Sequence, residues 1–122
     1  MGNDQKRITL LTFGFKYGRP PCNYFFDVSF LKNPAREKDW DLFSKPCANM
    51  RKFVLEQENC IRFIDTVIPL LKAVTTFDDD ARIGLGCSSG RHRSYIIADE
   101  IKRRLESDDV LVKLIHREEQ YQ

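Results

Sequence analysis

Residues 81–94 read ARIGLGCSSGRHRS, and this stretch determines both the expected fold and the candidate site. The apolar segment Ala81–Cys87 is typical of a buried strand, and Tyr95–Leu105 has the apolar periodicity of a helix. A turn of small residues between a strand and a helix N-terminus gathers backbone N–H groups at one place, where the helix dipole also favours negative charge. The stretch therefore predicts a binding site for phosphate or a similar oxyanion.

The side chains of this loop add further donors. Arg91 and Arg93 carry the planar guanidinium that suits phosphate, and His92 lies between them. The serine hydroxyls either donate to the anion or cap the following helix. Asp27, within a run of aromatic residues, is expected either to contact a ligand or to pair with a loop arginine. The expected ligand-binding residues are Cys87, Ser88, Ser89, Gly90, Arg91, His92, Arg93, Ser94 and Asp27.

The remaining strands are predicted from short apolar runs. Besides Ala81–Cys87, the sequence indicates strands at Ile8–Phe15, Tyr24–Phe30 and Asp109–Ile115. Because a helix separates the last two strands, we expect a right-handed parallel crossover between them. Residues 16–23 and most of residues 32–46 are predicted to form loops.

Helical spacing marks two further segments, Cys47–Gln57 and Asn59–Val74, with Pro69 expected to bend or shorten the second. The expected fold class is α/β, a small mixed or parallel sheet of about four strands with helices packed on it. The phosphate-binding loop would lie between the third strand and the following helix. We expect residues 1–122 to form a single domain.

The composition limits the classes of function. With 42% hydrophobic and 31% charged residues and a net charge of +2, the chain is neither disordered nor a general polycation. None of the four cysteines forms a C-x-x-C pair, so we expect no metal site, no cofactor and reduced thiols in the cytoplasm. The apolar run Ile8–Phe15 is too short to span a membrane, and no membrane association is expected.

Cys87 and Arg93 also fit a second chemistry, since C-x-x-G-x-x-R-S is the signature loop of cysteine-dependent phosphatases. In that hypothesis Cys87 is the nucleophile and Arg93 holds the phosphoryl oxygens. A general acid is not evident, although Asp27, Asp39 and Asp78 are candidates. Two other interpretations of Cys87 stay open: it lines a ligand pocket, or it packs as a small apolar residue.

Basic residues outside the loop suggest a third function. If they gather beside Arg91 and Arg93, they would form a basic surface with an aromatic side chain, Tyr17, that suits RNA. The residues concerned are Lys16, Arg19, Lys102, Arg103, His116 and Arg117.

Four ordered motifs point to a known family. They are TFGFKYG at 12–18, FDVSFLKNP at 26–34, GCSSGRHRS at 86–94, and His116-Arg117. Over nearly its whole length the chain resembles the C-terminal domain of the bacterial RNase adapter protein RapZ, of the YvcJ-type nucleotide-binding proteins, here as a free-standing domain. The resemblance implies an α/β module that binds a small RNA, senses glucosamine-6-phosphate and self-associates as a homodimer or higher oligomer. It also implies that Cys87, Ser88, Ser89, Gly90, His92 and Arg93 line the phosphate pocket and that Asp27 contacts the sugar.

The chain departs from the family pattern at several places. Ser29 replaces an arginine and Ala35 replaces a histidine, which leaves the sugar undetermined, and the acidic end at 118–122 predicts weaker RNA binding. No G-x-x-x-x-G-K-[ST] motif occurs, so we expect no P-loop NTPase activity. We therefore favour a non-catalytic module that binds a phosphorylated metabolite or nucleotide and also RNA or a protein. A cysteine phosphatase and an RNA-binding module without a small ligand are the alternatives.

Overall fold

The computed structural model describes residues 5–34 and 45–119. Within them a four-stranded sheet has the order β2-β3-β1-β4, and every neighbouring pair is parallel. The strands are β1 (Lys6–Gly14), β2 (Tyr24–Asp27), β3 (Arg82–Cys87) and β4 (Val110–His116). The predicted α/β class and the parallel sheet are confirmed.

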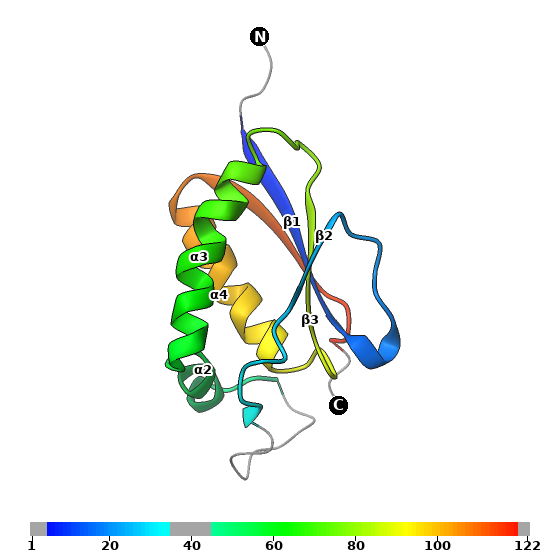
Figure 1. Ribbon diagram of the computed structural model, residues 1–122, viewed down its shortest axis with the longest axis vertical. Helices are drawn as coiled ribbons and strands as arrows, with labels where there is room; N and C mark the ends of the chain where they lie inside the picture. Colours follow the sequence, from blue (N-terminus) through cyan, green and yellow to red (C-terminus); the bar gives the residue numbers. More distant parts are fainter. Residues whose placement is uncertain (1–4, 35–44, 120–122) are drawn as a thin grey trace.

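Helices cover one face of this sheet (Figure 1). They are α2 (Ala48–Leu55), α3 (Glu58–Val74) and α4 (Arg93–Ser107). Strand residues of alternating position, such as Leu10 and Leu85, are fully buried against the apolar stripes of α3 and α4. Burial of this face is the main favourable term for folding, because it removes a large apolar area from water.

The opposite face is covered only in part. A short 3₁₀ helix, η1 (Phe15–Tyr17), and the loop after it cross this face on the way from β1 to β2 (Figure 1). The ring of Phe13 contacts the rings of Phe15 and Phe25 edge to face, at centroid distances of 4.8 and 5.9 Å. Gly86 makes room for this cluster, since a Cβ there would lie 2.7 Å from the Phe13 and Phe15 rings.

The second strand is shorter than predicted, and the expected effect of Pro69 on helix length is not seen, whereas the ends of the other elements shift by one or two residues. β2 ends at Asp27 and not at Phe30, because the Asp27 carboxylate accepts a hydrogen bond from the Ser29 N–H and turns the chain. α3 continues through Pro69 to Val74, so the proline does not shorten it. Ala35 and Asp39, two positions singled out in the sequence, lie outside the described residues.

None of the helices in residues 5–34 and 45–119 is both long and apolar enough to cross a membrane.

Candidate functional site

The predicted loop lies where strand geometry places ligand sites in α/β proteins, beyond the carboxyl ends of the strands. Cys87 is the last residue of β3, and α4 begins at Arg93 with His92 as its N-cap. Gly14 at the end of β1 is the register partner of Cys87, and Asp27 at the end of β2 is that of Gly86. Three strand ends therefore meet at this loop.

Close backbone packing fixes the loop on the end of β1. Gly90 has φ +75°, and a Cβ there would lie 2.5 Å from the Gly14 nitrogen. A Cβ on Gly14 would lie 2.5 Å from the carbonyl carbon of Ser89. In addition, the Lys16 N–H donates to the Ser88 carbonyl at 3.3 Å. Only glycine fits at positions 14 and 90, because the two backbones touch there.

Three backbone N–H groups of the loop make no hydrogen bond within the described residues. The N–H groups of Ser88, Ser89 and Gly90 donate no hydrogen bond to any residue in the described part of the chain. They stand directly before the N-terminus of α4, whose dipole adds partial positive charge. These two features together favour the binding of an anion.

Cys87 lies beneath the loop and is only 2% exposed. Its Sγ is 3.3 Å from the Oγ of Ser94, which is fully buried. Ser94 thus contacts the thiol and does not cap the helix, and the N-cap His92 makes no capping hydrogen bond with its side chain either. The Cys87 sulfur is therefore buried under the loop and packs against the first turn of α4.

Arg93 points inward. Its Nη1 donates to the carbonyls of Ser29 and Leu31 at 2.9 and 3.1 Å, and its Nη2 donates to the Ser88 hydroxyl at 3.2 Å. The side chain is only 8% exposed. These bonds use three of the five N–H groups that a guanidinium carries. Arg93 therefore ties the turn after β2 to the loop after β3, and two of its N–H groups make no hydrogen bond within the described residues.

Asp27 shapes the turn that Arg93 grips. Its Oδ1 accepts from the Ser29 N–H at 2.8 Å, and the Val28 N–H donates to the Gly86 carbonyl at 2.8 Å. These two bonds set the path of the chain into the residues whose carbonyls face Arg93. Asp27 acts on the site through this turn and forms no ion pair with a loop arginine within the described residues.

A cavity of about 340 Å³ adjoins the loop and is lined by Tyr17, Arg91, Arg117 and Glu118. Glu118 Oε2 accepts from the Gly14 N–H at 3.1 Å and from Arg117 at 2.6 Å. Tyr17 is 52% exposed. The cavity thus combines two guanidinium groups with an accessible aromatic ring.

Some of the predicted basic residues lie in or near this cavity. The Lys16 ammonium lies 5.3 Å from the Tyr17 ring, the Arg19 guanidinium lies about 6 Å from the rings of Phe15 and Phe25, and Arg117 donates to the Gly18 carbonyl. Lys16, Arg19, Arg91 and Arg117 are therefore grouped around the η1 loop, and we call them the basic cluster.

Lys102 and Arg103 do not belong to the basic cluster. They lie in the second half of α4 and pair with Glu106 and Glu100 on that helix. Because α4 starts beside the loop and runs back to the amino end of the sheet, these residues are directed toward the other end of the domain.

His116 belongs to a half-buried network that the sequence analysis missed. Its Nδ1 lies 2.7 Å from the Thr12 Oγ1 and its Nε2 lies 3.2 Å from the Asp99 Oδ1, and Arg51 also donates to Asp99 at 2.7 Å. The Tyr95 ring stacks on the imidazole with a centroid distance of 3.5 Å. No spacing in the sequence reveals the network, since Thr12 and His116 meet only through the β1–β4 register.

The network also shifts the pKa values of two of its members, Asp99 and Tyr95. Burial would raise the pKa of Asp99, but the hydrogen bonds from His116 and Arg51 outweigh it and lower that pKa below its ordinary value. Burial, reinforced by the neighbouring Glu119 carboxylate, raises the pKa of Tyr95 to about 12. Both groups therefore keep one charge state across the neutral range.

The two candidates for general acid within the described residues, Asp78 and Asp27, do not assemble with Cys87. Asp78 accepts from the Tyr24 hydroxyl at 3.0 Å, in the turn that precedes β3, and so lies at the opposite end of that strand from Cys87. Asp27 is at the correct end but accepts from the Ser29 N–H. Among the described residues, no group of three or more His, Cys, Asp or Glu side chains is arranged to hold a metal ion.

Comparison with known proteins confirms the resemblance drawn from the four motifs. A nucleotide-binding protein of Clostridium beijerinckii is 34% identical over 120 residues, which are 93% of this chain and 41% of that protein. One from Dictyoglomus thermophilum is 38% identical over 117 residues, which are 91% of this chain and 40% of that protein. The chain thus spans about two fifths of the length of these relatives. A family model for the RapZ C-terminal domain matches residues 6–120, and the chain belongs to that family.

Proposed function

We propose that this domain is a non-catalytic binding module whose Cys87–Ser94 loop holds the phosphate of a metabolite or nucleotide. One observation carries the proposal: three consecutive N–H groups, those of Ser88, Ser89 and Gly90, have no acceptor within the described residues and precede a helix N-terminus. An oxyanion supplies the acceptors that these donors lack.

The arginines take different roles in this proposal. Arg93 is a positioning residue, since it holds the loop against the Ser29 and Leu31 carbonyls and directs its remaining donors from a fixed place. Arg91, at the cavity beside the loop, meets the ligand from the solvent side. His92 is 5% exposed, and its backbone carbonyl accepts from the Ile96 N–H at 2.8 Å in the first turn of α4.

The names of the relatives support a nucleotide as one ligand class. They describe whole proteins of which this chain covers about two fifths, so the name does not assign the nucleotide to this domain. The cavity next to the loop adds an argument from this chain, because Tyr17 offers a face on which a base can stack. The same basic cluster is the surface on which we place RNA or a protein partner.

A binding module is favoured over a phosphatase. A cysteine phosphatase needs an accessible thiolate and an acid for the leaving group. Here the Cys87 sulfur is buried against Ser94, and the guanidinium of Arg93 is bonded to two carbonyls. Binding of an anion by the N–H groups of Ser88, Ser89 and Gly90, by contrast, requires neither a reactive thiolate nor a general acid.

Calorimetric titration with inorganic phosphate, glucosamine-6-phosphate and AMP tests the proposal. We expect at least one phosphate ligand to bind and Arg91→Ala to weaken it about tenfold, as loss of a charge-assisted hydrogen bond does. Arg103→Ala removes a similar charge from α4 and serves as the matched control. Absence of binding for all three ligands, or equal loss in both variants, would contradict the proposal.

A further inference from the structure

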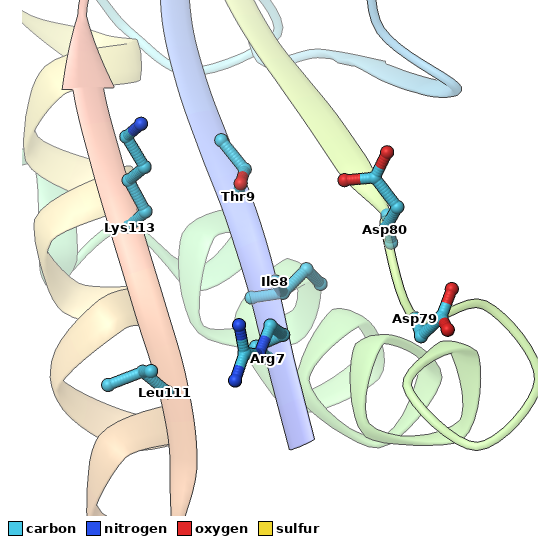
Figure 2. A pocket seen from close by; sticks show the side chains of 8 residues that line it. Arg7, Ile8, Thr9, Asp79, Asp80, Leu111 and Lys113 are labelled. Atoms are coloured by element: carbon cyan, nitrogen blue, oxygen red, sulfur yellow. The ribbon is translucent and has the colours of Figure 1, made fainter. Parts of the chain in front are cut away.

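A second hollow, of about 280 Å³, lies at the other end of the sheet, away from the phosphate-binding loop. It is on the face that the helices leave open, over the first half of β1 (Figure 2). Arg7 and Leu111 are register partners there, as are Thr9 and Lys113, so the four side chains share one face. The turn before β3 contributes Asp79 and Asp80 to the opposite rim.

Charges of opposite sign are separated across this hollow. Figure 2 shows Arg7 and Lys113 on the strands to one side and the carboxylates of Asp79 and Asp80 on the other, with Thr9 on the floor between them. Within residues 5–34 and 45–119, neither cation makes an ion pair and neither carboxylate accepts a hydrogen bond. By comparison, the Lys72 ammonium lies 3.0 Å from the Asp108 carboxylate, and the Arg62 guanidinium lies 2.7 Å from the Glu58 carboxylate.

The sheet holds the two cations close to each other. Arg7 and Lys113 lie on adjacent strands two register positions apart, and Arg82, the partner of Thr9 on the other side, adds a third guanidinium that donates to the Pro21 carbonyl. Like charges at such positions repel one another unless an anion joins them. The strand side of the hollow is therefore suited to a carboxylate, and the aspartate side to an ammonium group.

The lining also restricts the ligand as a whole. It holds both signs of charge, two cations on the strands and two carboxylates on the turn, which suits a ligand that itself carries both signs. Leu111 is 53% exposed beside the charged groups and offers an apolar contact. We propose that this hollow binds a small zwitterion with a carboxylate, an ammonium group and an aliphatic side chain, such as a free aliphatic amino acid.

Three probes that share the leucine side chain separate the contributions of the two charged groups. L-leucine carries both charges, N-acetyl-L-leucine lacks the cation, and L-leucinamide lacks the anion. Titration of the ¹⁵N-labelled chain, followed at the amides of Thr9, Ala81 and Lys113, should give a dissociation constant for leucine at least tenfold below that of either analogue. Equal constants for the three probes, or shifts confined to amides elsewhere, overturn the proposal.

Variants assign the two ends of the ligand. Lys113→Gln should weaken leucine about tenfold and leave leucinamide unchanged, whereas Asp80→Asn should weaken leucine and leave the acetylated probe unchanged. Lys102→Gln on α4 is the control for loss of a surface lysine. Because all three positions are exposed or half-exposed and outside the core, we expect the variants to fold. Equal effects of Lys113→Gln and Lys102→Gln on leucine binding refute the site.

Discussion

Replacement of Arg93 by alanine tests the idea that this side chain holds the site together from within. The substitution removes three hydrogen bonds from a guanidinium that is only 8% exposed. A hydrogen bond to a charged group contributes about 1.5–3 kcal/mol, and the contributions of one side chain are not additive. The Ser29 and Leu31 carbonyls also lose their donor, although water can reach the more open of them. We therefore expect Arg93→Ala to lower the free energy of unfolding by about 3 kcal/mol.

Urea denaturation followed by circular dichroism measures this loss. Arg103→Ala is the matched control, since its partner Glu100 lies on the same helix and the arginine is largely exposed. Surface ion pairs of that kind contribute about 0–1 kcal/mol. A loss below about 1 kcal/mol for Arg93→Ala, or equal losses in the two variants, would show that Arg93 is not a structural tie.

Three other predictions concern the loop and the half-buried network. Gly90→Ala should destabilise the fold by at least about 2 kcal/mol, because left-handed backbone costs about 1–2 kcal/mol and the new Cβ meets the Gly14 nitrogen. Gly18→Ala, at φ +87° and ψ 157° with open space around the new Cβ, should show in the same denaturation assay only the cost of a backbone conformation that essentially glycine alone populates. Because the pKa of Asp99 is lowered in the fold, ionised Asp99 stabilises the fold above its ordinary pKa of 3.8, and this stabilisation is lost as the pH falls through the pKa of the folded state. Asp99→Asn should therefore remove that acid dependence from the melting temperature, and a pH profile of the melting temperature that the substitution leaves unchanged would contradict this role of Asp99. The pKa of Tyr95 near 12 should produce a late step in absorbance titration of the tyrosines, and Tyr95→Phe should abolish that step alone.

The strand–loop–helix at the candidate site could be predicted because each part has a local signal. The apolar run before Cys87, the small residues of the loop and the periodicity after Tyr95 all lie within one continuous stretch. The parallel direction of the strands could also be predicted, because two strands joined through a helix usually run in the same direction. These features depend on neighbours in the chain.

The roles of individual side chains depend on distant residues and could not be predicted. Arg93 points inward because a turn over 60 residues earlier, shaped by Asp27, presents two carbonyls to it. His116 is half-buried and stacked on Tyr95 because the β1–β4 register sets it opposite Thr12. A C-x-x-G-x-x-R-S motif alone therefore does not reveal whether its arginine faces a ligand or the protein.

The most direct test of the phosphate-binding loop is a titration of the ¹⁵N-labelled chain with inorganic phosphate, read at the amides of Ser88, Ser89 and Gly90. We expect these three resonances to move downfield together along one saturable curve, because each N–H gains an anionic acceptor. Resonances that stay in place while phosphate shifts other amides, or that do not respond at all, would contradict an anion site at the end of β3.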